Sequence, residues 1–221
     1  TKQCSVAPHL GIPTKWLEFL KRVTNDNQDL IAYLQRFAGY ALSGDTSEHA
    51  LAFLYGTGAN GKTTFVQCLL GILGGYAITA PIETFAETRS ERHSTELARL
   101  RGSRLVATEE TGTGTRWNES RIKTLTGGNR ISAHFMRQDD FEFQPEFKLL
   151  IAGNHKPSMR SVDEAMKRRM HIVPFTVTIP EEERDKHLAD KLKQEWPQIL
   201  HWMIEGHAAW RDYRLAPPEE I

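Results

Sequence analysis

The sequence predicts an α/β protein with a mostly parallel central sheet flanked by helices. Three short apolar runs carry this prediction, at residues 50–55, 104–108 and 147–152, and polar residues suited to a strand end follow each of them. Strands of a parallel sheet are buried on both faces and therefore read as continuous apolar runs. Segments that read as helices, at residues 64–73 and 117–125, lie between the runs.

The loop after residues 50–55 has the spacing of a phosphate-binding loop. Gly56 is followed by four residues and then by Gly61, Lys62 and Thr63, which fits the pattern G-x-x-x-x-G-K-[ST]. Glycine permits positive φ angles and close approach of a ligand to the backbone. N–H groups at a helix N-terminus attract phosphate. In this pattern the lysine reaches the β- and γ-phosphates and the threonine hydroxyl ligates Mg²⁺.

The residues expected to bind a nucleotide are Gly56, Thr57, Gly58, Ala59, Asn60, Gly61, Lys62, Thr63 and Thr64. A glycine-rich turn without a ligand is the alternative. A strand before the loop and a helix after it, ended by Gly74 and Gly75, favour nucleotide binding.

Composition and charge set further bounds. The 221 residues fit one large α/β domain. The formal net charge is zero, so any nucleic-acid contact must be local. Cys4 and Cys68 form no metal-ligand spacing or disulfide framework, which suits a reducing compartment. Without a bilayer-length apolar run or a signal-peptide pattern, we expect an intracellular, cytoplasmic protein with no membrane partner. The first residue is Thr1 rather than Met, so we expect a piece of a longer polypeptide.

The chain divides into three segments. Residues 1–48 are expected to be a helical N-terminal layer that packs without chemistry, after a poorly ordered lead-in at residues 1–10. Residues 49–180 form the core that carries the loop, with a β-hairpin at about 131–143, and residues 181–221 form C-terminal helices.

Two further strand ends carry candidate catalytic residues. Glu109 and Glu110 end the second apolar run. A nucleotide-hydrolysing site needs one carboxylate to hold Mg²⁺ and another to position or deprotonate the attacking water. Asn154 follows the third run, where α/β sheets build their sites, and its amide can orient a water molecule. Adjacent acids at a strand end are also common as solvated residues, but their position downstream of the loop favours a catalytic role.

Cations occur at two other places. Arg168 and Arg169 precede a strand interrupted by Pro174, which predicts an edge strand. An arginine there can pair with acids of its own chain or reach a phosphate bound by a neighbouring subunit. Arg137 and Gln138 lie at the expected hairpin tip, where a cation can contact a nucleic-acid backbone. From spacing alone, an ordinary exposed turn is favoured.

Taken together, these motifs resemble the ATPase domain of superfamily 3 helicases, in particular the phage, plasmid and poxvirus primase–helicase family. The resemblance covers nearly the whole chain, and its motifs follow one another in the family's order. They are Gly56-x-x-x-x-Gly61-Lys62-Thr63, Glu109-Glu110, Lys123-x-x-Thr126-Gly127-Gly128 with the hairpin after it, Leu149-Leu150-Ile151-Ala152-Gly153-Asn154, and Arg168-Arg169 before Ile172-Val173-Pro174-Phe175. Residues 34–45 also resemble the helical segment before this family's ATPase core.

The resemblance implies an AAA+-type P-loop ATPase that assembles as a ring, usually hexameric. ATP would lie between neighbouring subunits and single-stranded DNA would pass through the centre. The full-length chain would carry an upstream primase-type domain and a downstream winged-helix domain.

The resemblance also implies roles for matching residues. Lys62 and Thr63 would bind phosphate and Mg²⁺, Glu109 would support the metal, Glu110 would be the base, and Asn154 would sense the γ-phosphate. Arg168 or Arg169, with a slight preference for Arg169, would be the arginine finger. The hairpin matches the family's DNA-tracking element, so the candidate DNA contacts are Arg137, His134 and Lys123; Lys123 could instead approach the γ-phosphate. The tip is less basic than in many relatives.

Three functions follow from these observations. The favoured one is a Mg²⁺-dependent ATPase, a hydrolase that drives a replicative helicase of a phage or mobile element along single-stranded DNA. A phosphotransferase acting on a small molecule is an alternative, with residues 84–101 as its lid. A non-catalytic module that binds nucleotide only to assemble is another. Adjacent acids and a strand-end asparagine suit attack by water better than transfer to an acceptor.

Overall fold

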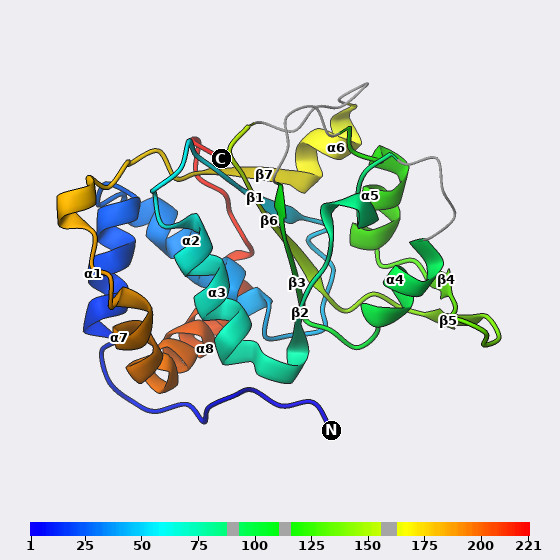
Figure 1. Ribbon diagram of the computed structural model, residues 1–221, viewed down its shortest axis with the longest axis horizontal. Coiled ribbons are helices and arrows are strands. Elements are labelled where there is room, and N and C mark those ends of the chain that lie inside the picture. The colour runs from blue at the N-terminus through cyan, green and yellow to red at the C-terminus, as the bar shows by residue number, and fades with distance from the viewer. Residues whose placement is uncertain (88–92, 111–115, 156–162) are drawn as a thin grey trace.

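The computed structural model describes residues 1–87, 93–110, 116–155 and 163–221. Its centre is a five-stranded, fully parallel sheet in the order β2-β3-β6-β1-β7 (Figure 1). The strands are β1 (Leu51–Tyr55), β2 (Ala77–Thr79), β3 (Leu105–Glu110), β6 (Lys148–Gly153) and β7 (Met170–Pro174). The predicted α/β class with a mostly parallel sheet is confirmed.

The register aligns the carboxyl ends of four strands. Gly153 of β6 pairs with Glu110 of β3 on one side and with Tyr55 of β1 on the other, and Tyr55 also pairs with Pro174 of β7. The loops after these strands therefore leave the sheet at one common edge, which is where α/β sheets place ligand sites.

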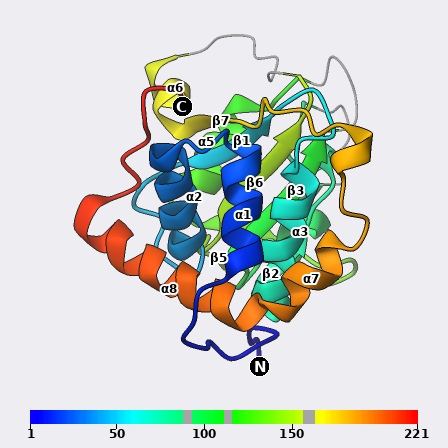
Figure 2. The same cartoon turned by 90° about the vertical axis from the view of Figure 1, so that its left-hand side faces the viewer.

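Helices cover both faces of the sheet. On one face the sheet shares a core with α1 (Thr14–Val23), α2 (Gln28–Tyr40), α3 (Lys62–Leu73), α7 (Leu188–Gln194) and α8 (Trp196–Tyr213); Figure 2 shows α1 between α2 and α3, with α8 running across below them. The other face packs against α4 (His93–Arg99), α5 (Glu119–Thr126) and α6 (Glu164–Arg169). Short 3₁₀ turns lie at Gly74–Tyr76, Ile82–Thr84 and Glu181–Glu183. No helix within the described ranges is both long and apolar enough to cross a membrane.

The N-terminal and C-terminal helices form one layer because two glycines let α2 and α8 approach closely. A Cβ atom on Gly39 would lie 2.1 Å from the backbone nitrogen of His207, and one on Gly206 would lie 2.1 Å from the carbonyl oxygen of Gln35. Residues from both ends of the sequence thus share one hydrophobic core with α3 and the sheet.

The antiparallel hairpin predicted at about 131–143 is present as β4 (Ile131–Ala133) and β5 (Phe141–Phe143). It projects from the molecule beside α4 (Figure 1). Helices on this face begin at side-chain caps: Asn118 accepts a hydrogen bond from the backbone N–H of Arg121, and Asp163 accepts one from that of Met166. Asparagine and aspartate at these positions satisfy N–H groups that have no partner within the helix.

The prediction of a poorly ordered lead-in is wrong. Ser5 N–H donates to Ile72 O at 2.9 Å, His9 N–H donates to Pro197 O at 3.0 Å, and Gly75 N–H donates to Gln3 O at 3.0 Å. These bonds hold the first residues along the ends of α3 and α8, and Cys4 and Val6 pack on the core there.

Candidate functional site

The phosphate loop, residues 56–63, joins β1 to α3 and has the backbone conformation that its glycines predict. Gly58, Ala59 and Gly61 have φ angles of 112°, 51° and 84°. A Cβ atom on Gly56 would lie 2.0 Å from Phe175 O, and one on Gly61 would lie 2.6 Å from Val23 Cγ1. Positions 56 and 61 therefore leave no room for a side chain.

The ammonium group of Lys62 lies inside the curve of this loop. The residue is only 6% exposed. Its Nζ donates to Gly56 O at 2.6 Å, to Asn60 Oδ1 at 3.0 Å and to Asn154 Oδ1 at 3.1 Å. The structure thus brings together two residues that the sequence singled out separately, the loop lysine and the strand-end asparagine.

The chain after β7 holds the loop in place. Asn60 Nδ2 donates to Phe175 O at 2.7 Å, and the backbone N–H of Ile179 donates to Ala59 O at 2.8 Å. Phe175 N–H in turn donates to Tyr55 O at 2.7 Å. Sequence reasoning missed both Phe175 and Ile179 as loop supports, because neither carries a chemical signal and both act through backbone atoms.

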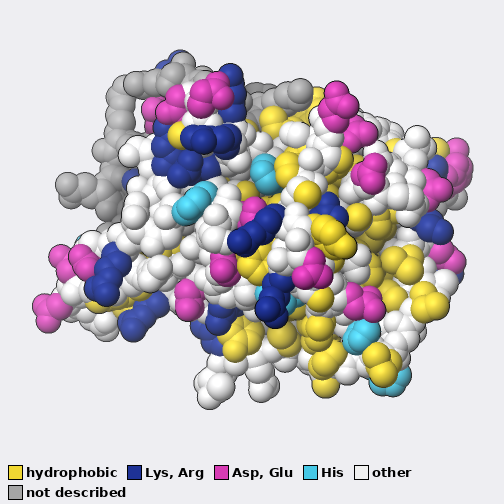
Figure 3. Space-filling view, turned by 180° about the vertical axis from the view of Figure 1, so that it is seen from behind, with side chains coloured by type: hydrophobic (Ala, Val, Ile, Leu, Met, Phe, Trp, Pro, Cys, Tyr) yellow, Lys and Arg dark blue, Asp and Glu magenta, His cyan; other side chains and the backbone are white. Residues whose placement is uncertain are grey.

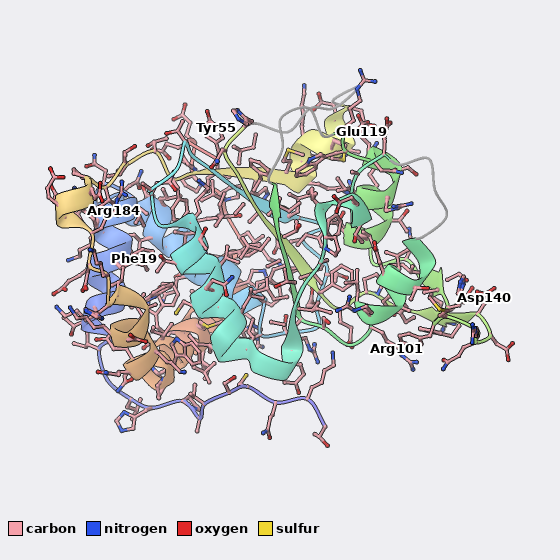
Figure 4. All side chains as sticks on the ribbon, in the orientation of Figure 1. Phe19, Tyr55, Arg101, Glu119, Asp140 and Arg184 are labelled. Atoms are coloured by element: carbon pink, nitrogen blue, oxygen red, sulfur yellow. The ribbon has the colours of Figure 1, made fainter. Side chains whose placement is uncertain are left out.

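A depression of about 520 Å³ lies over the loop and the end of β6, and its lining includes Lys62, Thr63 and Asn154. A groove of about 550 Å³ lies next to it and shares Ala59, Gly61 and Thr64. One wall of this groove comes from α1 and the other from residues 183–191; Phe19 and Arg184, on the two walls, are labelled in Figure 4. Helix α1, part of the N-terminal segment expected to pack without chemistry, therefore lines part of the groove next to the loop.

The two candidate carboxylates occupy the last positions of β3. Glu109 is in register with Ala152 of β6 and Glu110 with Gly153, and β6 separates both from β1 and the start of the phosphate loop. Thr63 is exposed in the first turn of α3. Within the part of the chain that the structure describes, no three His, Cys, Asp or Glu residues cluster as a metal site.

The structure does not bring Arg168 or Arg169 to the phosphate loop of the same chain. Both lie in the last turn of α6, where Figure 3 shows basic side chains gathered on the surface. Arg168 is exposed and its Nε donates to Glu164 O at 3.2 Å. Arg169 is half-buried and its Nη1 donates to Ala165 O at 2.9 Å. Of the two guanidinium groups, that of Arg168 is the more accessible.

The three predicted DNA contacts do not form one cationic patch. Lys123 on α5 pairs with Asp163, the N-cap of α6, and this hydrogen bond holds the pKa of the Asp163 carboxyl below its ordinary value. His134 Nδ1 lies 3.0 Å from Asp140 Oδ1 on the hairpin. Arg137 is at the hairpin tip with a φ angle of 62°. The lid that a phosphotransferase would need, residues 84–101, lies partly outside the described residues.

Together, the fold and the site define an α/β protein with a lysine-bearing glycine loop at the carboxyl edge of a parallel sheet. A family model described as "Family of unknown function (DUF5906)" matches residues 54–169, more than half of the chain. The chain belongs to this family.

Large DNA viruses encode relatives of this chain. It is 31% identical over 159 residues to "Putative helicase L207/L206" of Acanthamoeba polyphaga mimivirus, across 71% of this chain and 16% of the viral protein. It is 29% identical over 181 residues to "Putative helicase 022R" of Frog virus 3 (isolate Goorha), across 79% of this chain and 18% of that protein. The chain thus spans less than one fifth of the length of either relative.

Solved structures share the fold. The A form apo structure of the NrS-1 C-terminal region matches with a TM-score of 0.72 and 12% identity, over 90% of this chain and 47% of that one. The apo structure of NrS-1 residues 305–718 matches with a TM-score of 0.71 and 12% identity, over 93% of this chain and 52% of that one. At this identity the likeness is one of fold.

Proposed function

We propose that this chain is the ATP-hydrolysing module of a helicase that moves along single-stranded DNA. The observation that carries the proposal is the position of Lys62, buried inside a glycine loop with its ammonium bonded to the amide of Asn154. A buried cation among backbone N–H groups at a helix N-terminus suits a polyphosphate. Similarity to viral proteins that carry helicase names supports the choice of activity.

Each residue of the site has a proposed task. Lys62 moves from its contacts within the loop to the β- and γ-phosphates, and the loop N–H groups bind the remaining oxygens. Asn154 has its carbonyl oxygen directed to Lys62, which leaves the amide N–H groups to orient the γ-phosphate or the attacking water. Glu110 accepts a proton from that water. Thr63 and Glu109 hold Mg²⁺, which neutralises charge that develops on the phosphate oxygens.

The nucleoside half of ATP is proposed to occupy the groove beside the loop. The groove begins at loop residues Ala59 and Gly61 and offers the apolar face of Phe19 together with charged side chains of residues 183–191. Apolar side chains of such a groove can pack against the base, and the charged ones can hydrogen-bond to the base edges and the sugar.

The site as proposed needs a neighbouring subunit. The exposed guanidinium of Arg168 is the proposed arginine finger, because the side chain of Arg169 is half-buried; each of the two guanidinium groups donates a hydrogen bond to a carbonyl oxygen of α6. An arginine supplied in trans accelerates hydrolysis by stabilising charge in the transition state. The proposal therefore includes a homo-oligomeric ring, an AAA+-type hexamer as in superfamily 3 helicases. It also includes primase-type and winged-helix domains in the full-length protein and a place in the cytoplasm of the host cell.

Steady-state ATPase assays test the proposal. Turnover per subunit should rise with protein concentration and with added single-stranded DNA, and Lys62→Ala should abolish it. Glu110→Gln should bind a fluorescent ATP analogue yet fail to hydrolyse ATP, which separates a motor from an assembly module. Mixing Arg168→Ala subunits with Lys62→Ala subunits should restore part of the ATPase activity. The control is Arg211→Ala, which removes an exposed arginine on α8 and should hydrolyse ATP like the wild type. Turnover independent of both concentration and DNA would refute the motor.

A further inference from the structure

The hairpin carries a row of aromatic rings that runs from the core to its tip. Phe143 is buried, and its ring centroid lies 6.1 Å from that of Phe141. Phe141 lies 5.6 Å from Phe135, with the two rings inclined by 26°. Arg101, in the turn after α4, places its Cζ 5.1 Å from the centroid of Phe141. These contacts fix the ring of Phe135 at the outer end of the row.

Two large apolar side chains remain exposed at this outer end. Phe135 is 38% exposed and Met136 is 74% exposed. The turn itself is closed by a hydrogen bond from Gln138 N–H to Phe135 O at 3.0 Å. An aromatic ring and a thioether presented on a projecting turn are unusual for an ordinary solvated loop, in which small and polar residues dominate.

The charges of the hairpin do not add up to a phosphate-binding surface. Arg130 lies 3.7 Å from Glu142, and His134 lies 3.0 Å from Asp140. At the turn, Arg137 is accompanied by Asp139 in the sequence. Figure 3 shows acidic and basic side chains together on this projection, and Figure 4 labels Asp140 at its end. With acids at least matching cations, attraction to a polyphosphate backbone is weak here.

We infer that the hairpin tip contacts single-stranded DNA through the faces of its bases, with Phe135 and Met136 as the contacting side chains; this inference rests on the proposed function. Stacking needs only an accessible π-face, so it works without a net positive charge. A methionine sulfur beside an aromatic ring adds a further favourable contact. Base faces are accessible in single strands and covered in a duplex, which selects the single strand as the ligand.

A protein partner fits the tip less well. A stable protein interface buries roughly 800 Å² on each side, and two apolar side chains followed in the sequence by Arg137, Asp139 and Asp140 cannot supply such a surface. A base, in contrast, is matched in size to one aromatic ring.

Two oligonucleotides of equal length separate stacking from backbone contact. One is oligothymidylate and the other is the same sugar–phosphate chain without bases, and binding is followed by fluorescence anisotropy with an ATP analogue present. Phe135→Ala should weaken oligothymidylate binding roughly tenfold and leave binding of the abasic strand unchanged. Phe135→Trp should preserve affinity, and Phe135→Leu should lose it although its side chain stays apolar. Tyr213→Ala, which removes an aromatic side chain that is 70% exposed on α8, is the matched control.

Three results would overturn the inference. They are an equal loss on both strands, no loss on oligothymidylate, and a change in oligomer mass without a change in DNA affinity. Thermal melts of each variant exclude misfolding. Stimulation of the wild-type ATPase by DNA distinguishes failure of this inference from failure of the proposed function. If stimulation persists and Phe135→Ala binds DNA normally, only the stacking contact is refuted. If the wild type neither binds DNA nor responds to it, both the motor and the stacking contact are refuted.

Discussion

Replacing Lys148 by methionine should remove a large pH dependence of stability. Lys148 begins β6, at the opposite end of the strand from the phosphate loop, and is only 2% exposed. Its Nζ donates to the carbonyl oxygens of Ser43 and Glu146 and lies 4.3 Å from the ring centroid of Tyr40. Burial lowers the pKa of this ammonium from 10.5 to about 7, because the charged form loses its hydration.

The sign and size of the effect follow from this pKa. Below about pH 7 the folded and the unfolded chain both carry the proton, and the full cost of burying the charge is present. Between about pH 7 and 10.5 the unfolded chain binds a proton that the folded chain does not, so the free energy of unfolding rises with pH. At about 1.4 kcal/mol per pH unit, the whole window corresponds to about 5 kcal/mol, of which about 3 kcal/mol falls between pH 6.5 and 9.5.

Urea denaturation of wild type and Lys148→Met at pH 6.5, 8.0 and 9.5 measures this term. Methionine keeps an unbranched stem but cannot bind a proton, so the difference between the two free energies of unfolding isolates Lys148. That difference should shift by about 3 kcal/mol in favour of wild type from the lowest to the highest pH. Lys193→Met is the control, because this exposed lysine also lies over an aromatic ring, 5.7 Å from the centroid of Trp196. A difference that stays flat with pH would refute the reasoning.

Three further predictions concern the site and the core. Gly56→Ala places a Cβ atom 2.0 Å from Phe175 O. The backbone shift that relieves this clash should lower the free energy of unfolding by about 1–3 kcal/mol and abolish binding of a fluorescent ATP analogue. A variant that binds the analogue with wild-type affinity would contradict the loop geometry. Lys123→Ala removes the hydrogen bond that lowers the pKa of the Asp163 carboxyl. Titration of this carboxyl by NMR should give a higher pKa in the variant than in the wild type, closer to the ordinary value of 3.8. An unchanged pKa would mean that the ion pair does not form in solution. Burial raises the pKa of the Cys68 thiol to about 12. At pH 8, iodoacetamide should therefore leave Cys68 unmodified in the folded chain and alkylate it after unfolding, as measured by mass spectrometry. Rapid labelling of the folded protein would contradict the burial of this thiol.

Much of the architecture was predictable because its signals are local. The phosphate loop is recognised by its glycine spacing, and the apolar residues 149–152 of β6 indicate a buried strand, which the structure contains. Helix starts also depend on local features: at the start of α2, the side chain of Asn27 accepts a hydrogen bond from Leu30 N–H at 3.0 Å. Each of these features depends on residues within a few positions of one another.

Other features were not predictable because they depend on contacts between distant segments. Asn60 bonds to Phe175, 115 residues away, and Lys62 to Asn154, 92 residues away. Lysine is rarely buried without a paired charge, so its residue type gives no hint that Lys148 lies inside the protein. The order of the strands in the sheet decides which strand ends meet, and no local pattern encodes that order.

Helix α1 packs directly against the phosphate loop. Phe19 and Val23 lie where a side chain on Gly61 would have to go, so α1 packs directly against the N-cap residue of α3. Because α1 shares one core with α2, α3 and α8, and because the backbones of α2 and α8 approach closely, we expect the conformation of the loop to be coupled to the N-terminal and C-terminal helices. A close-packed layer transmits small displacements rather than absorbing them. In the proposed motor, we therefore expect the helical layer to transmit displacements of the loop on nucleotide binding to the N-terminal and C-terminal helices and to whatever these helices contact.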